Sequence, residues 1–302
     1  MLIEKKNLYK QAHTFRCVHE AHRHFNSEMS PFHILSKKNC FPHGCVYFHW
    51  QCRLLAKQKK CFRGFTTVGR ECFNCKYFYE EKQHQYPQFI ENGQNQDTFM
   101  QAFEEFEEWI NELQNKRINV EGTVAAVTPE LSLKYSGRQL QLQMNGFVVR
   151  FDQGFIDNQL FADPFYLSIS AMSQNKLQLR ENDELEFDAG LLIDRGRFKF
   201  IRPGRFQFYQ RGENRALRRN DVLVALRTYS IQKNQPLKCM RCAYGQLVDA
   251  ENRKNGPSRL TVCLQGIADY RYCTISMESF ENSNGDSCIN NSWVKMNCNH
   301  VL

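Results

Sequence analysis

The sequence predicts an α+β protein in three parts: a helical, Cys- and His-rich N-terminal domain, an antiparallel β-barrel, and a small C-terminal module that holds a metal through four cysteines. Three observations lead to this prediction. The 13 Cys lie only in the first and last thirds of the chain. The Cys-free middle alternates apolar and polar residues with the period of a β-strand. One segment before it repeats apolar residues with the period of a helix.

The distribution of Cys and His sets the expected domain boundaries. Residues 1–95 hold seven Cys and eight of the nine His, residues 96–230 hold neither, and residues 231–302 hold the other six Cys. We therefore expect a metal-binding domain at 1–95, a connecting helix at 96–115, the barrel at 116–230 and the four-cysteine module at 231–302.

Composition favours metal over disulfides as the use of these thiols. The 302-residue chain has no run of about 18 apolar residues, and its first segment, MLIEKKNLYKQAHTF, has no apolar signal region. These features predict a cytoplasmic protein without a membrane span, and disulfides rarely persist in the cytosol. The net charge of +8 suggests an acidic partner. Two four-thiolate metal sites, each contributing about −2, would reduce that charge to about +4.

The connecting helix is predicted by the segment DTFMQAFEEFEEWINELQNK. Glu residues occupy its other face, and Asp97 is the expected N-cap. Its apolar stripe consists of Phe99, Phe103, Phe106, Ile110 and Leu113.

About five antiparallel strands are predicted for the barrel. The segments INVEGTVAAV, RQLQLQM, RGRFKFI and RFQFYQR alternate with period 2, and SG, NG and RPG turns interrupt them. The opening VEGTVAAV and the later LRENDELEFDAGLLIDRGRFKF make residues 116–212 resemble the OB-fold, a small Greek-key barrel. The resemblance implies an oligonucleotide-binding surface, although other OB-folds bind sugars or proteins.

A basic face is predicted on two of these segments, because their Phe residues alternate inward. Cations that follow phosphates, with an aromatic ring on which a base stacks, are typical of single-strand binding. Two alternatives are a solvated sheet face whose cations prevent edge aggregation, and a surface for an acidic protein. The residues of the predicted face are Arg195, Arg197, Lys199, Arg205, Tyr209 and Arg211.

Four cysteines near the C-terminus are predicted to bind one metal centre. They follow the pattern C-x2-C-x20-C-x9-C, which has one knuckle-like pair where a zinc ribbon usually has two. Cys288 and Cys298 are further candidates or small apolar residues. The predicted ligands are Cys239, Cys242, Cys263 and Cys273.

A second centre is predicted near the N-terminus, with at least four ligands from a set of six cysteines. On a helix from about 45 to 60, Cys45, His49 and Cys52 would share a face, whereas Cys17, His22 and His24 are additional candidates. The six cysteines are Cys40, Cys45, Cys52, Cys61, Cys72 and Cys75.

The expected cofactor is a [4Fe–4S] cluster, with Zn2+ as the alternative. Three features favour the cluster: the missing second C-terminal knuckle, more N-terminal thiols than one zinc ion uses, and an aromatic shell that would exclude water. His49 would suit zinc better than a cubane.

The sequence indicates three possible functions. The first is a non-catalytic protein that binds single-stranded nucleic acid, the second an iron–sulfur redox protein that uses the barrel for docking, and the third an assembly factor that holds an acidic protein. The chain has no P-loop, GxGxxG after a strand, GxSxG or HExxH, so no enzyme class is indicated.

Overall fold

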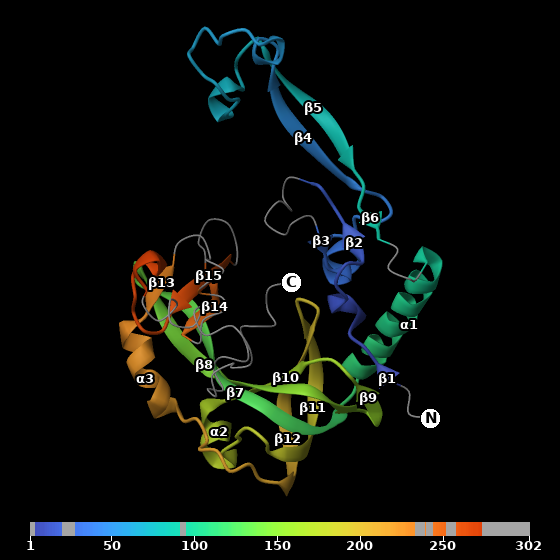
Figure 1. Ribbon diagram of the computed structural model, residues 1–302, viewed down its shortest axis with the longest axis vertical. Helices are drawn as coiled ribbons and strands as arrows, with labels where there is room; N and C mark the ends of the chain where they lie inside the picture. The colour runs from blue at the N-terminus through green and yellow to red at the C-terminus, as the bar shows by residue number, and fades with distance from the viewer. Residues whose placement is uncertain are drawn as a thin grey trace, which may run out of the picture. The chain divides into compact units, whose positions relative to one another are not determined.

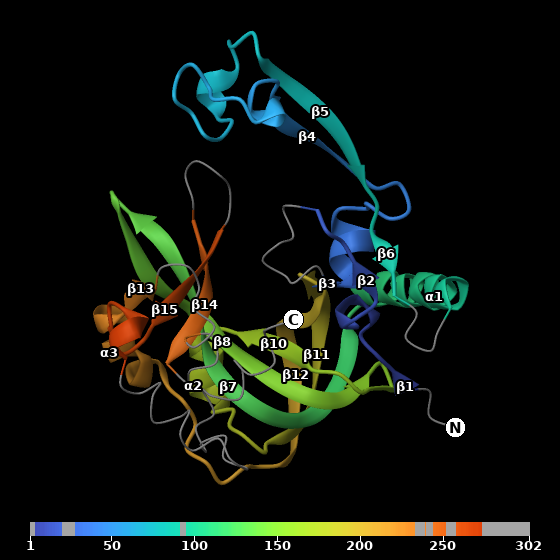
Figure 2. The ribbon, with the colours of Figure 1, turned by 45° about the horizontal axis from the view of Figure 1, so that its top comes forward.

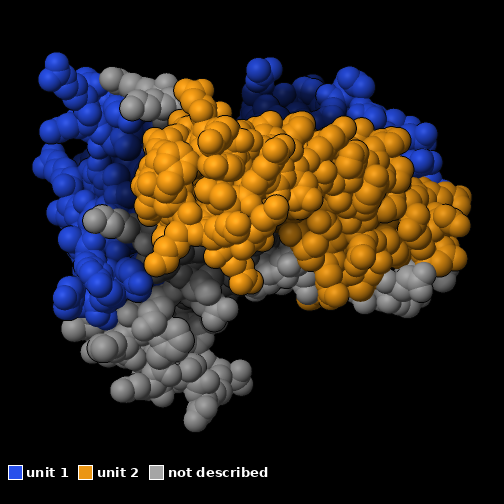
Figure 3. Space-filling view, turned by 90° about the horizontal axis from the view of Figure 1, so that it is seen from above, with its two compact units in different colours: residues 1–7, 104–302 blue, residues 8–103 orange. Residues whose placement is uncertain are grey.

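The computed structural model describes residues 4–19, 28–90, 95–232, 239, 244–251 and 258–273. Contacts divide the chain into two compact units, residues 8–103 and residues 1–7 with 104–302 (Figure 3). Within the described residues, no helix combines the length and apolar character that crossing a membrane requires.

Between residues 8 and 90, the first unit consists of two small antiparallel sheets and short helical turns. One sheet has the order β3 (Glu28–Met29), β2 (Phe15–Arg16), β6 (Gln88–Phe89), and the other pairs β4 (Cys45–Cys52) with β5 (Phe78–Gln85). Figure 1 shows β4 and β5 as a two-stranded ribbon with a long loop at one end. The helical turns are η1 (Leu8–Lys10), η3 (Phe32–Lys37), η4 (Leu55–Lys57) and η5 (Arg70–Cys72).

The prediction of a helical N-terminal domain is therefore wrong. The segment CVYFHWQC, expected on a helix, is strand β4, which pairs along its whole length with β5. Its β-branched and aromatic residues favour an extended chain, and this preference outweighs the i, i+4, i+7 spacing of Cys45, His49 and Cys52.

The predicted connecting helix is confirmed as α1 (Gln96–Gln114). All five residues of its predicted apolar stripe are buried. The expected N-cap is wrong by two positions, because the side-chain oxygen of Asn95 accepts the backbone N–H of Thr98 at 2.8 Å.

Residues 1–7 and 104–302 form a ten-stranded mixed sheet. Its order is β1-β9-β8-β10-β12-β11-β7-β14-β15-β13, and three of its pairs are parallel: β1–β9, β10–β12 and β14–β7. In the described part of these residues, the sheet is accompanied by the later part of α1, by α2 (Ala171–Leu177), by α3 (Arg219–Thr228) and by the helical turn η6 (Tyr270–Tyr272). The strands are β1 (Glu4–Lys5), β7 (Ile118–Ser136), β8 (Gln139–Ile156), β9 (Gln159–Phe161), β10 (Phe165–Ile169), β11 (Glu184–Asp194), β12 (Arg197–Gln210), β13 (Ser230–Gln232), β14 (Gly245–Ala250) and β15 (Ser258–Cys263).

The prediction of a separate antiparallel, OB-like barrel is also wrong. Five of the strands between residues 118 and 210 do form a ring, because the β7–β8 pairing closes β8, β10, β12, β11 and β7 on one another. However, β7 and β8 are far longer than this ring requires, and β7 continues as one curved strand to pair with β14 (Figure 2). The C-terminal strands β14, β15 and β13 are therefore part of the same mixed sheet as this ring.

Two groups of buried side chains stabilise this sheet. Within the five-strand ring, Phe165 stacks on Phe151 with ring centroids 4.9 Å apart and meets the edge of Phe200 at 5.7 Å. Farther along β7 and β8, a second core joins these strands to α3, β14 and β15. Its members are Leu131, Leu133, Leu142, Val222, Val248, Ala250, Val262 and Leu264.

Candidate metal centre

The loop between β4 and β5 has almost no hydrophobic support of its own. No side chain from residue 53 to residue 77 is buried, and Phe62 and Phe73 are 68% and 46% exposed. Ordering a residue costs roughly 1–2 kcal/mol of backbone conformational entropy, which packing of apolar side chains normally offsets. Another interaction must therefore hold this loop in one conformation.

Three cysteines of this loop and Cys52, the last residue of β4, line one small cavity together with Leu55, Phe65, Val68 and Phe78. None of the four forms a disulfide. As the thiols stand, no three His, Cys, Asp or Glu side chains in the described parts of the chain are arranged to hold one ion. The thiols therefore surround the cavity but do not converge on one point. Rotation about χ1 moves each sulfur between staggered positions and can bring the four sulfurs together. The four are Cys52, Cys61, Cys72 and Cys75.

Local turns present these thiols to the cavity. Cys52 is the last, buried residue of β4. A turn in which the Gly64 N–H donates to the Cys61 carbonyl at 3.0 Å positions the second thiol, and Gly64 adopts φ +78° there. The Cys75 N–H donates to the Cys72 carbonyl at 2.9 Å, so one tight turn carries the last two thiols. Such a C-x2-C turn is typical of thiolate metal sites.

Arg63 adds positive charge to the same cavity. Its guanidinium donates to the Glu71 carbonyl at 2.8 Å and lies 5.0 Å from the centre of the Phe65 ring. This positive charge would offset part of the negative charge of four metal-bound thiolates.

The other two predicted N-terminal ligands, Cys40 and Cys45, are not near this cavity. Cys45 and Cys52 are the two ends of β4, and at about 3.3 Å per residue a strand of this length separates them by about 23 Å. The structure therefore does not bring the six predicted cysteines together. Cys40 and Cys45 instead lie near Cys17, which sequence reasoning did not include among the six.

The environment of Cys40 and Cys17 disfavours negative charge on their thiols. Burial, the hydrogen bond to Cys45 and the neighbouring thiols raise the pKa of Cys40 to about 12. Burial also raises the pKa of Cys17, against the effect of a hydrogen bond from the His19 backbone. Without a cation, these two thiols are neutral at physiological pH.

The C-terminal set is described only in part, because Cys242 lies outside the described residues. Cys263 ends β15 and is opposite Gly245 of β14. A Cβ on Gly245 would lie 1.7 Å from the carbonyl oxygen of Cys239, so only glycine allows this approach. The turn before Cys273 is attached to β13, since the Gln232 side chain accepts the Tyr270 N–H at 3.1 Å and donates to the Ile267 carbonyl at 2.6 Å.

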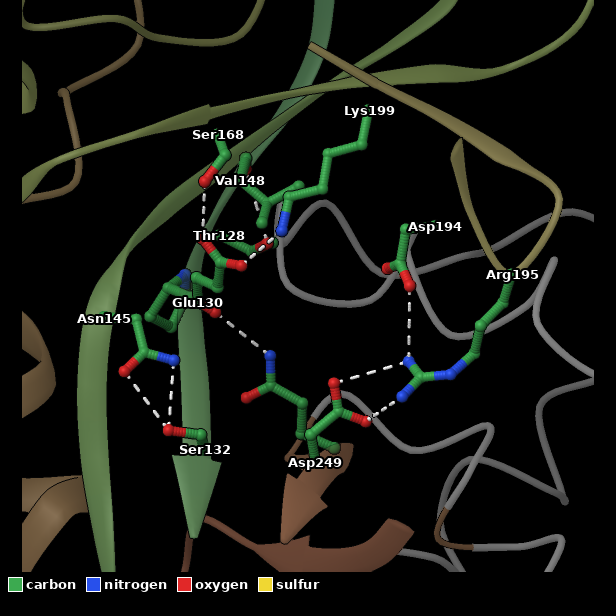
Figure 4. Close-up of polar contacts among 12 residues, drawn as sticks. Thr128, Glu130, Ser132, Asn145, Val148, Ser168, Asp194, Arg195, Lys199 and Asp249 are labelled. Carbon is green, nitrogen blue, oxygen red and sulfur yellow. Dashed lines mark hydrogen bonds and ion pairs between the residues drawn. The ribbon is translucent and has the colours of Figure 1, made fainter. Parts of the chain in front are cut away.

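The residues of the predicted basic face lie along one strand and its ends, and most of their positive charges are paired with acidic side chains. Its two segments are parts of one strand, β12, rather than two neighbouring strands, although Phe198 and Phe200 are buried as expected. Figure 4 shows Lys199 paired with Glu130, which also accepts the Ser168 hydroxyl at 2.6 Å, and Arg195 paired with Asp249 at 2.7 Å.

The remaining members of this face also have partners within the chain. Arg205 pairs with Asp188 at 3.2 Å, and the Arg197 guanidinium lies 5.8 Å from the Tyr166 ring centre. The Tyr209 hydroxyl donates to Glu186, which raises the pKa of Tyr209 to about 12. Arg211 pairs with buried Asp183 at 3.2 Å and donates to the Leu177 and Gln178 carbonyls.

Comparison with protein-family models, with curated proteins and with solved structures finds no match to this chain.

Proposed function

We propose that the protein is a non-catalytic binding protein whose β4–β5 loop is held in one conformation by a thiolate-bound metal. The ligands are Cys52, Cys61, Cys72 and Cys75. The observation that carries the proposal is the position of these four thiols around one cavity, at a loop in which no side chain between residues 53 and 77 is buried. Metal binding then supplies the folding free energy that a hydrophobic core supplies elsewhere.

We expect zinc rather than a [4Fe–4S] cluster at this centre. The separation of Cys40 and Cys45 from the loop leaves four thiols, so the excess of thiols over the needs of one tetrahedral zinc ion, which favoured a cluster, no longer exists. The exposure of Phe62 and Phe73 also weakens the argument that aromatic residues exclude water from a cluster.

Metal and acid-labile sulfide analysis of protein purified without air tests this proposal. We expect a colourless protein that contains zinc and no sulfide, because zinc is d10 and redox-silent. A brown protein whose visible absorbance dithionite bleaches would replace zinc with an iron–sulfur cluster and would favour a redox function. Less than one equivalent of any metal would overturn the metal centre itself.

Single-stranded nucleic acid is a candidate partner, and the exposure of Arg205 and Tyr209 supports it. The Arg205 side chain is 87% exposed despite its contact with Asp188, and Tyr209 is 49% exposed. Exposed ion pairs contribute about 0–1 kcal/mol, so a phosphate can compete for this arginine. An acidic protein would use the same cations.

We expect weak, salt-dependent binding of a labelled single-stranded oligonucleotide, measured by fluorescence anisotropy at low salt. Arg205→Ala with Tyr209→Ala should reduce affinity by roughly 10-fold or more, because base stacking alone contributes about 1–3 kcal/mol. Arg138→Ala with Tyr135→Ala, on the β7–β8 hairpin, is the matched control. Equal affinity of both double variants, or no binding by the unmodified protein, would contradict this candidate.

A further inference from the structure

Three thiols outside the loop centre form a separate cluster at the other end of β4. Cys17 and Cys40 are 1% and 2% exposed, and Cys45 is half-buried. The Cys45 and Cys17 thiols are near enough to Cys40 to help raise its pKa, and the Cys40 thiol donates to the Ile34 carbonyl oxygen at 3.8 Å. Three thiols in one largely buried place supply most of the ligands that a tetrahedral metal ion needs.

A tight turn in the segment CFPHGC brings Cys40 and Cys45 together. The Gly44 N–H donates to the Cys40 carbonyl at 2.5 Å, and Gly44 adopts φ +78°. A Cβ on Gly44 would lie 2.8 Å from the Tyr86 ring and 3.0 Å from the Gln85 carbonyl oxygen. Glycine is therefore required both by the backbone conformation and by the close approach of the end of β5.

Cys17 and His19 reach the same turn from the segment that directly follows strand β2. Phe15, Cys17 and His19 alternate with the exposed Arg16 and Val18, so they share the inner side of an extended segment. The Phe15 ring lies 5.2 Å from the Phe41 ring, beside Cys40.

The position of His19 is fixed by two further contacts. Its backbone N–H donates to the Cys17 thiol. Its ring lies 4.7 Å from the ring of Tyr47, which is two residues after Cys45 and so on the same face of β4. The imidazole is therefore on the side of β4 from which the Cys45 thiol projects.

We propose that Cys17, Cys40, Cys45 and His19 bind one zinc ion at a second site, separate from the loop centre. Three thiolates with one imidazole are a Cys3His ligand set, which suits tetrahedral zinc and not a common all-cysteine cubane. The length of β4 prevents the two sites from sharing a ligand. This site does not depend on the loop centre, because its four ligands come from other segments. It would join β2, the CFPHGC turn and the start of β4, none of which belongs to the loop.

Zinc titration of full-length variants tests the second site. Cys40→Ser should remove one zinc equivalent from the protein, and Cys72→Ser with Cys75→Ser should remove a different one, so the triple variant loses both. His19→Ala should weaken zinc binding at the second site at least 10-fold, whereas His43→Ala, at an exposed position in the same turn, should leave it unchanged. Equal zinc content of Cys40→Ser and the unmodified protein would overturn the site. Equal affinities of His19→Ala and His43→Ala would overturn the assignment of His19.

Thiol labelling of the unmodified protein gives a result even if Cys40→Ser does not fold. Cys45 is half-buried, so iodoacetamide can reach it, and mass spectrometry identifies the labelled position. In protein stripped of metal, we expect added Zn2+ to slow labelling of Cys45 at least 10-fold, because bound thiolate is no longer available as a nucleophile. The same labelling rate with and without Zn2+ would overturn the second site. The loop centre is assessed separately in the same samples through Cys61 and Cys75.

Discussion

Replacing Cys72 and Cys75 with Ser is expected to remove the metal from the loop centre and to unfold residues 53–77. Structural zinc in small domains contributes roughly 10–16 kcal/mol of apparent binding free energy at neutral pH, far more than the few half-buried contacts of this loop. The loop contains seven trypsin sites: Arg53, Lys57, Lys59, Lys60, Arg63, Arg70 and Lys76. Limited trypsin digestion followed by mass spectrometry should therefore show fast cleavage within 53–77 in the double variant.

Asn74→Ser is the matched control for this experiment. Asn74 is exposed and lies between the two cysteines, so the change alters the same turn without removing a sulfur. The control should keep its metal and its resistance to trypsin, and the sheet formed by residues 104–302 should melt normally in both proteins. Unchanged metal content and an unchanged cleavage pattern in the double variant would contradict the proposed centre. Chelation of metal from the unmodified protein should reproduce the cleavage pattern of the double variant.

The local features of this metal centre could be predicted from the sequence, but which cysteines belong to it could not. The C-x2-C pair at Cys72 and Cys75 is visible as a motif, because one tight turn determines its geometry. Whether Cys45 joins Cys52 depends on the conformation of the six residues between them. A helix would place both thiols on one face, whereas the observed strand places them at opposite ends.

In the long sheet, too, features that depend on neighbouring residues were predictable, whereas the partners of the cations were not. The periodicity of α1 and the inward Phe198 and Phe200 were predictable, because each depends on residues close in sequence. The partners of Lys199 and Arg195 were not, since Glu130 and Asp249 are brought beside them from β7 and β14. The alternation of residues along the chain predicts a basic surface, but the cations of that surface are largely paired with acidic side chains from other strands.

The second large effect is expected at Asp183, which lies in the segment LRENDELEF. Its carboxylate is fully buried, and it accepts the Arg180 N–H at 2.9 Å and the Gly212 N–H at 2.8 Å. The Arg211 guanidinium pairs with the same carboxylate at 3.2 Å. The carboxylate therefore connects the turn before β11 to the residues after β12. A Cβ on Gly212 would lie 2.0 Å from the Glu181 carbonyl oxygen, which shows how closely these two segments approach.

Asp183→Ala should therefore lower the free energy of unfolding by about 3–5 kcal/mol, measured by urea denaturation. The change leaves the buried Gly212 N–H and the partly buried Arg180 N–H without an acceptor and removes the partner of Arg211. Asp188→Ala is the matched control, because Asp188 pairs with the largely exposed Arg205 and such pairs contribute about 0–1 kcal/mol. Metal content should be the same in both variants, because neither residue belongs to the unit that carries the loop centre. If the two variants are equally stable, the buried carboxylate does not hold these strand ends together. If Asp183→Ala is the less stable by the expected margin, Arg211 serves the fold through Asp183. It would then be the member of the predicted nucleic-acid surface least able to bind a phosphate.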